Sequence, residues 1–356
     1  MKKIGINLYP TSMCDTGCRH CLDDSGTRNP VHFTEKMAQQ IVDEAREGDY
    51  GLEVLFSGGG EPLMATELLG ITEAFGGYEK TGQFVMITSG FTDAEKDGFR
   101  KGQLEALLDM ELRKNIHVEH SFNLYHPSFS ERFKNAIELL IENGKDFMSA
   151  RICMSRENII ETWTVFEETI NLAAHSLDAK NIFRLPLGWH HGNGDGFFSA
   201  LGRIARKPNR LGFLTKESFL INQWYVMIVD GERMILVDAH PISLEKIGRG
   251  KNIKGLPYNP FYYCDAFDED GSFGTALFIS PNGNVYPGCN CNNGSDEMYL
   301  GKIGRDSLID IVGRKRNFCT MIMREILASK AEFQWMTYDT CRICRQIAAK
   351  KGFDLK

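Results

Sequence analysis

The chain has 356 residues, of which 42% are hydrophobic and 23 are phenylalanine, so it is long enough for one large domain and a smaller one. Its formal net charge of −6 argues against a nucleic-acid partner or an anionic membrane surface, because both attract clustered Lys and Arg. The first residues lack the apolar stretch of a signal peptide, and no apolar run reaches the ~18–20 residues of a membrane span, so we expect a cytoplasmic protein.

The first half of the chain alternates short apolar runs with helical patterns. Apolar residues such as Phe133, Ile137 and Ile141 recur with the period of a helix that buries one face. Six such βα units predict a parallel sheet, which right-handed crossovers curl into a full or partial barrel. The strands are expected at Ile4–Tyr9, Glu53–Phe56, Phe84–Ile87, His117–Phe122, Phe147–Cys153 and Asn181–Leu187, and the helices at Thr34–Glu47, Thr66–Phe75, Lys101–Leu112, Phe129–Glu142 and Glu161–His175.

The second half of the chain breaks this alternation. Residues 188–209 are rich in glycine and polar residues, which is typical of a loop. Hairpins are predicted over Trp224–Val237 and Thr275–Tyr286, and Leu308–Ile326 has a helical pattern. We therefore predict an α/β fold in three parts: a partial (β/α)6 barrel over 1–190, a connecting segment with a β-hairpin over 191–254, and a small α+β domain over 255–356.

Cys14, Cys18 and Cys21 follow directly on the first predicted strand, at the end where βα enzymes place their chemistry. In a cytosolic protein such spaced cysteines indicate ligation rather than disulfides. Their thiolates can bind three corners of a cubic [4Fe–4S] cluster and leave the fourth iron open for another ligand. A zinc site with His20 or His32 as the fourth ligand is the alternative.

A glycine-rich loop, Ser57–Leu63, follows the second predicted strand. Gly58, Gly59 and Gly60 let the backbone approach a ligand and adopt positive φ, and Glu61 offers a carboxylate to a cationic amine. The loop lies one βα unit beyond the cysteines, at the same end of the barrel. It therefore favours a cluster with a bound cofactor over a zinc module, which has no need of such a loop.

The Cys14-xxx-Cys18-xx-Cys21 spacing and the Gly59-Gly60-Glu61-Pro62 segment resemble the radical S-adenosylmethionine (SAM) superfamily, over roughly residues 4–190. The resemblance implies that SAM chelates the open iron and is cleaved by one electron to a 5′-deoxyadenosyl radical, which removes a hydrogen atom from a substrate carbon. It also implies that Gly59, Gly60 and Glu61 contact the methionyl amino group. One departure is His20, where the family often has an aromatic residue. Further positions that resemble SAM contacts of the family are Thr88, Ser89 and Ser121.

A second cysteine group lies towards the C-terminus. Cys341 and Cys344 form a CxxC pair, and Cys264 with Cys289 completes a four-thiolate set that suits zinc or an iron–sulfur cluster. Their order resembles the Twitch domain, a shorter relative of SPASM that binds an auxiliary [4Fe–4S] cluster; Cys291 is an alternative ligand to Cys289. A cluster with four cysteine ligands has no open iron, so electron transfer is its expected role. We thus expect an oxygen-sensitive protein with two [4Fe–4S] clusters, SAM and a reducing partner such as flavodoxin or ferredoxin.

Polar residues on the later barrel strands are candidates for substrate contacts, because polar groups in buried parallel strands need partners or ligands. We expect Asn123, Arg151 and Arg184 to line the lumen and contact SAM or substrate, with salt bridges inside the barrel as the alternative. The cysteines outside the two ligand sets are candidate hydrogen donors, or else small buried hydrophobic residues; these are Cys153, Cys291 and Cys319.

Three functions remain open from the sequence. The leading hypothesis is a radical SAM enzyme that dehydrogenates or epimerises a small polar molecule, such as a sugar, aminocyclitol or amino-acid derivative. It rests partly on the first strand beginning at residue 4, which leaves no preceding peptide-recognition domain. The alternatives are a ribosomal-peptide maturase that forms thioether or carbon–carbon links or epimerises residues, and a zinc-stapled binding protein without catalysis.

Overall fold

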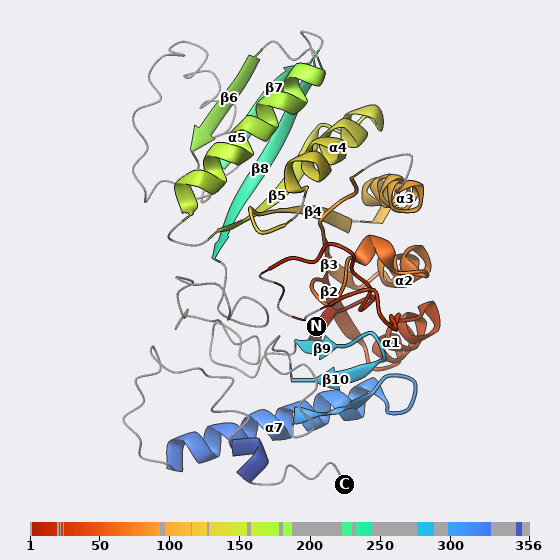
Figure 1. The fold of residues 1–356 in the computed structure, drawn as a ribbon. Helices are drawn as coiled ribbons and strands as arrows, with labels where there is room; N and C mark the ends of the chain where they lie inside the picture. Colours follow the sequence, from red (N-terminus) through yellow and green to blue (C-terminus); the bar gives the residue numbers. More distant parts are fainter. Residues whose placement is uncertain are drawn as a thin grey trace.

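The computed structural model, shown in Figure 1, describes the βα part of the chain almost continuously and the C-terminal part in segments. Within these segments, no helix is long and apolar enough to cross a bilayer. The described residues are 2–19, 21, 23, 25–92, 97–114, 116–126, 128–154, 158–177, 181–186, 223–229, 233–243, 276–287, 298–328 and 347–350.

Strands and helices alternate through the first half, as the apolar pattern predicts. The strands are β1 (Lys2–Leu8), β2 (Tyr50–Phe56), β3 (Thr81–Thr88), β4 (Ile116–Phe122), β5 (Phe147–Met154), β6 (Asn181–Pro186), β7 (Gln223–Val229), β8 (Arg233–Ser243), β9 (Leu277–Ile279), β10 (Asn284–Tyr286) and β11 (Gly301–Lys302). The helices are α1 (Glu35–Glu47), the 3₁₀ turn η1 (Pro62–Met64), α2 (Leu68–Gly76), α3 (Gly98–Lys114), α4 (Phe129–Glu142), α5 (Ile159–Ser176) and α7 (Leu308–Ala328).

All described strands belong to one sheet of 11 strands, in the order β11-β10-β9-β1-β2-β3-β4-β5-β8-β7-β6. Strands β1 to β5 run parallel, each beside the next. Figure 1 shows α5, α4, α3, α2 and α1 following one another along this sheet, with α7 next to β10. The described sheet has two edges, β11 and β6, so it is the partial α/β barrel that the sequence predicts.

The strand beside β5 differs from the prediction. The sequence places Asn181–Leu187 there as the sixth barrel strand and assigns the later hairpin to a connecting segment. In the structure the whole of β5 pairs parallel with β8. β6 lies at the sheet edge, antiparallel to β7. The hairpin β7–β8 therefore belongs to the same sheet as strands β1 to β5.

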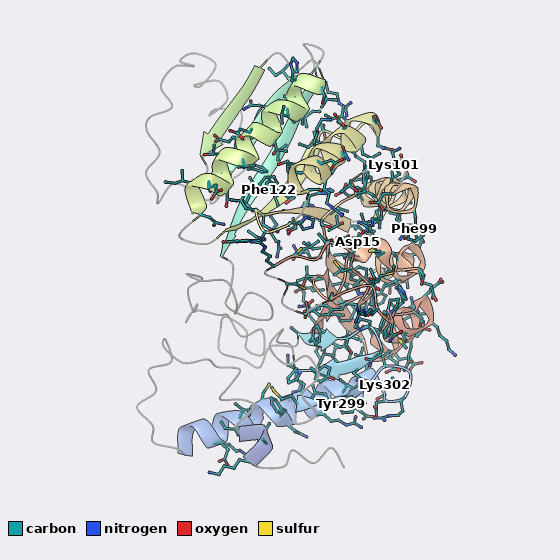
Figure 2. All side chains as sticks on the ribbon, viewed as in Figure 1. Asp15, Phe99, Lys101, Phe122, Tyr299 and Lys302 are labelled. Carbon is teal, nitrogen blue, oxygen red and sulfur yellow. The ribbon has the colours of Figure 1, made fainter. Side chains whose placement is uncertain are left out.

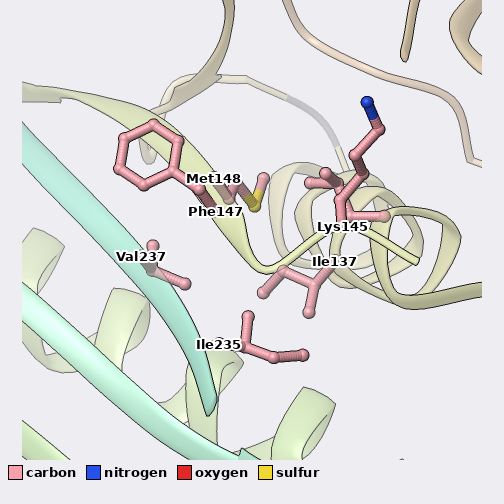
Figure 3. A pocket seen from close by; sticks show the side chains of 7 residues that line it. Ile137, Lys145, Phe147, Met148, Ile235 and Val237 are labelled. Atoms are coloured by element: carbon pink, nitrogen blue, oxygen red, sulfur yellow. The ribbon is translucent and has the colours of Figure 1, made fainter. Parts of the chain in front are cut away.

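Two features of these strands fit this exchange of positions. β6 ends at Pro186, which lacks a backbone N–H and therefore suits an edge strand. β8 is anchored at its start by Arg233, whose guanidinium donates to the carbonyl oxygen of Ile141 at 2.9 Å. Figure 3 shows the contact between these elements at the amino-terminal ends of β5 and β8. Apolar side chains of α4, β5 and β8 meet there, among them Ile137, Met148, Ile235 and Val237.

The C-terminal segment continues the same sheet on its other side. β9 pairs parallel with β1, and β9 and β10 form an antiparallel pair across the turn at Gly283, whose φ is +83°. This pairing confirms the second predicted hairpin. Glycine suits the turn because it adopts positive φ without strain. Helix α7 contains Cys319, which is buried in the hydrophobic core.

The two faces of β4 show how the sheet separates core from site. Val118, His120 and Phe122 are buried, whereas the residues between them are partly exposed. Phe122, labelled in Figure 2, makes edge-to-face contacts with Phe133 of α4 and Phe166 of α5. The buried face therefore lies under the helices, and the partly exposed face lies on the opposite, concave side of the sheet.

His120 makes the stability of this core depend on pH. It is 2% exposed, its Nδ1 has no hydrogen-bond partner among the described residues, and burial, aided by nearby His117, lowers its pKa to about 4. The unfolded chain therefore binds the extra proton first, so stability is complete above pH 6.5 and falls as pH drops towards 4. Between pH 7 and 5, the unfolding free energy of His120→Leu, measured with urea, should fall by about 2 kcal/mol less than that of the wild type. An equal fall in both proteins would contradict a buried neutral imidazole.

Candidate active site

The cysteine loop begins directly after β1, at the carboxyl end of the sheet. Its three thiols, Cys14, Cys18 and Cys21, are all half-buried. Cys14 N–H donates to the carbonyl oxygen of Gly26 at 3.1 Å, and Cys21 N–H donates to that of Cys18 at 3.3 Å. These bonds fold the segment back on itself, so that all three cysteines of the predicted ligand set are presented by one compact loop.

The thiols influence one another's charge. Burial, followed by the negative charges of Cys14 and Cys21, raises the pKa of the Cys18 thiol to about 12. Burial is also the main reason why the pKa of Cys14 is raised. Three thiolates can therefore coexist here only beside a compensating cation, and binding of that cation would release their protons.

The glycine-rich loop after β2 docks directly on the cysteine loop. Gly60 N–H donates to the carbonyl oxygen of Thr11 at 2.7 Å, and Glu61 N–H donates to that of Met13 at 2.8 Å. A Cβ atom added to Gly60 would lie 2.1 Å from the Met13 carbonyl oxygen, which is far shorter than any contact that a real Cβ atom makes. Glycine at this position is therefore required for the two loops to meet.

The other two glycines of the loop, Gly58 and Gly59, adopt a backbone conformation that glycine favours. Gly58 and Gly59 have φ values of +85° and +71°, in the region that glycine adopts without strain. A side chain on either would collide with the ring of Tyr9. Gly59 N–H donates to Asp23 Oδ2 at 2.9 Å, a link from beyond the last cysteine that no sequence motif indicated.

Glu61 is the centre of a hydrogen-bond network between the glycine-rich loop and β3. Its Oε1 accepts from Thr88 Oγ1 at 2.5 Å and Leu63 N at 3.1 Å. Its Oε2 accepts from Ser89 N at 2.8 Å and Ser89 Oγ at 2.5 Å. A carboxylate has about four lone-pair positions, so this one has none left for an amine. The structure thus differs from the sequence-based expectation that Glu61 grips the amine of SAM: its carboxylate instead joins the turn after β3, with Thr88 and Ser89, to the glycine-rich loop.

A polar row runs along the concave face at the ends of β4 and β5. Ser121 and Arg151 are register partners on these strands. The Arg151 guanidinium is paired with Glu119, with Nε 2.8 Å from Oε2, and its side chain remains partly exposed. The Ser121 hydroxyl lies 3.9 Å from Cys153 Sγ, and burial raises the pKa of this thiol.

The remaining predicted site residues do not belong to this row of side chains on β4 and β5. Asn123 is buried, and its Oδ1 accepts from Tyr125 N at 3.1 Å, closing the turn after β4. Arg184 is on the edge strand β6, opposite Tyr225 of β7, so two strands separate it from β5. Cys319 is in the core on the β1 side of the sheet. The remaining cysteines of the predicted sites lie outside the described residues: Cys264, Cys289, Cys291, Cys341 and Cys344.

The described residues fit a cluster with a bound amino-acid-like cofactor. The donor set is three thiols of one loop, which is the ligand chemistry of iron–sulfur clusters. The glycine-rich loop packs directly against this loop, which only glycines at 58, 59 and 60 allow, and its Gly58 is exposed. Among the described residues no group of three or more His, Cys, Asp or Glu side chains is arranged around a single metal ion.

Comparison with known proteins identifies the family. Residues 8–169 match the family model of the radical SAM superfamily, and residues 272–345 match that of the SPASM iron–sulfur cluster-binding domain. No curated protein matches the chain. Among solved structures, BtrN in complex with AdoMet and 2-DOIA is similar at 14% identity, over 93% of this chain and 92% of that chain, with a TM-score of 0.42. Selenomethionine BtrN in an open conformation is similar at 11% identity, over 89% and 86%, with a TM-score of 0.35.

Residues 8–169 are thus a radical SAM domain, and residues 272–345 are a C-terminal SPASM iron–sulfur cluster-binding domain. The chain is therefore a radical SAM enzyme whose cofactors are a [4Fe–4S] cluster, SAM and a further iron–sulfur cluster in the SPASM domain. This confirms the family, the enzyme class and the cofactors expected from the sequence.

Proposed function

We propose that this radical SAM enzyme removes a hydrogen atom from a small polar molecule, such as a sugar, aminocyclitol or amino-acid derivative. When bound, the first cluster and SAM supply the 5′-deoxyadenosyl radical that performs this abstraction. The net outcome is dehydrogenation or epimerisation, and the mass of the product distinguishes the two: an oxidised product lacks a pair of hydrogen atoms, and an inverted product keeps its mass.

Within this proposal, Cys14, Cys18 and Cys21 bind the first cluster. Gly58, Gly59 and Gly60 offer backbone carbonyl oxygens to the methionyl amino group of SAM, because the N–H groups of Gly59 and Gly60 already donate to Asp23 and Thr11. Glu61 shapes their loop, and its acceptor positions are already filled by four hydrogen bonds. The SPASM cluster is assigned to four cysteines outside the described residues, Cys264, Cys289, Cys341 and Cys344, with Cys291 as the alternative to Cys289.

The polar row on β4 and β5 is the observation that supports a small polar substrate. The Arg151 side chain is 28% exposed and that of Glu119 12%, so the pair is partly accessible from the concave face. A guanidinium and a carboxylate offer donors and acceptors that hydroxyl and amino groups can join. An apolar substrate would leave such groups desolvated and unpaired.

The expected substrates are tested by incubating anaerobically reconstituted enzyme with SAM, dithionite and candidate compounds. The proposal predicts that a polyhydroxylated or amino-substituted small molecule increases the rate of 5′-deoxyadenosine formation. Stimulation by a ribosomal precursor peptide alone would contradict it and favour a peptide maturase.

Replacing Arg151 by Ala should lower kcat/KM for that substrate by about 10- to 100-fold, the effect of losing a charged hydrogen-bond donor. Slow cleavage of SAM without substrate should persist, because the cysteine and glycine-rich loops are untouched. Lys3→Ala is the matched control, because Lys3 of β1 pairs with Glu53 of β2 at 2.6 Å, on the two strands that precede the cysteine and glycine-rich loops. If both variants lose the same activity, Arg151 has no particular role in substrate binding.

A further inference from the structure

Two arginines that the sequence did not single out converge on the cysteine loop. Asp15, between Cys14 and Cys18, forms an ion pair with Arg100 of α3, and its Oδ1 lies 3.9 Å from Arg132 Nη2 of α4. Figure 2 labels Asp15 and also Phe99, which precedes Arg100 in the first turn of α3. Both arginine side chains are buried, at 3% and 7% exposure.

The same arginines reach the other loops of the site. Arg100 Nη2 lies 3.2 Å from the sulfur of Met64, directly after the glycine-rich loop. Arg132 Nη1 donates at 3.0 Å to the carbonyl oxygen of Gly90, in the turn after β3. The pair therefore connects the cysteine loop to the two loops that meet at Glu61.

This placement is unfavourable for the helices themselves. Arg100 and Arg132 lie in the first turns of α3 and α4, where the helix dipole disfavours cations. Arg100 Nη1 and Arg132 Nε are buried without a hydrogen-bond partner among the described residues, which a purely structural pair would avoid. Such local conflicts mark functional positions.

We propose that Arg100 and Arg132 are positioning residues that hold the cluster-bearing loop through Asp15 and balance the charge beside it. This rests on the proposed assignment of the cluster to the three cysteines of the loop. The set comprises two guanidinium groups and two carboxylates, since Arg100 Nε also lies 3.3 Å from Asp97 Oδ1. The cluster becomes more negative on reduction, so excess negative charge in this set opposes reduction and excess positive charge favours it.

The test is a redox titration of the electron paramagnetic resonance (EPR) signal that changes when SAM is added. Arg100→Gln and Arg132→Gln should each lower the ratio of reduced to oxidised cluster at a fixed potential about tenfold, a shift of about 59 mV to more negative values for a one-electron couple. Asp15→Asn should shift the potential in the opposite direction, and Arg100→Lys, which keeps the charge, should restore most of the wild-type value.

Opposite shifts of the reduction potential in the arginine and aspartate variants distinguish charge balance from a loosened loop. A loosened loop would shift the potential of all variants in the same direction or lower the iron content of each. Arg233→Gln is the control, because Arg233 is a part-buried arginine at the far end of β8; it should leave the potential unchanged. A wild-type signal that does not respond to SAM overturns the proposed function. A responsive signal with equal potentials in wild type, Arg100→Gln and Asp15→Asn overturns only this inference.

Discussion

Gly60→Ala should abolish SAM cleavage while leaving the barrel folded. The added methyl group would lie 2.1 Å from the Met13 carbonyl oxygen, so the glycine-rich loop must move away from the cysteine loop. The hydrogen bonds from Gly60 N–H and Glu61 N–H to that loop would break. Because displacement by about 1 Å can cost about 100-fold in rate, we expect at least about a 100-fold loss of 5′-deoxyadenosine formation, measured by chromatography.

The matched control is Gly26→Ala. Gly26 accepts the hydrogen bond from Cys14 N–H in the same cysteine loop. Among the described residues, no atom outside Gly26 and its two chain neighbours lies within 4 Å of a Cβ added to it. This variant should keep its activity and its iron content. Full activity of Gly60→Ala would show that the two loops do not meet as described.

Glu61→Ala has the second largest expected effect. It leaves Leu63 N–H, the Thr88 hydroxyl, Ser89 N–H and the Ser89 hydroxyl without their acceptor. Unpaired buried donors cost about 1–3 kcal/mol each. Water entering the vacated space offsets part of this, so we expect the unfolding free energy to fall by about 3 kcal/mol, together with loss of SAM binding. Urea unfolding and equilibrium dialysis measure the two effects.

The carboxylate of Glu67 provides the comparison. It accepts one exposed hydrogen bond, from Glu35 N at 2.8 Å, so Glu67→Ala should change the unfolding free energy by less than about 1 kcal/mol. If Glu61→Ala weakened SAM binding without changing stability, Glu61 would contact SAM directly, and its role as a link to β3 would be wrong.

Much of this site follows from the sequence because its signals are local. Each of the strands β1 to β5 is a short apolar run, and parallel βα units bring the segments after β1, β2 and β3 to one edge of the sheet. The order of the motifs along the chain therefore predicts that the cysteine loop and the glycine-rich loop lie side by side. The hydrogen bonds from Gly60 N–H to Thr11 and from Glu61 N–H to Met13 confirm that expectation.

The features that the sequence did not predict depend on long-range partners. β6 and β8 both mix apolar and polar residues. The hydrogen bond that anchors β8 joins Arg233 to Ile141 of α4, which lies 92 residues earlier in the chain. In the sequence, Arg100 and Arg132 are ordinary charged residues at or near the starts of helices, and only the fold brings Asp15 to them. The saturation of Glu61 likewise depends on donors from the end of β3.

The most direct test of the account is the EPR spectrum of the dithionite-reduced protein with and without SAM. Wild type should show a cluster signal that changes when SAM binds, and Cys14→Ala, Cys18→Ala and Cys21→Ala should each lack it. Their SPASM cluster signal and about half of the iron should remain, because each cluster type has its own cysteines. A signal that still responds to SAM in Cys18→Ala would contradict the assignment of the first cluster to this loop.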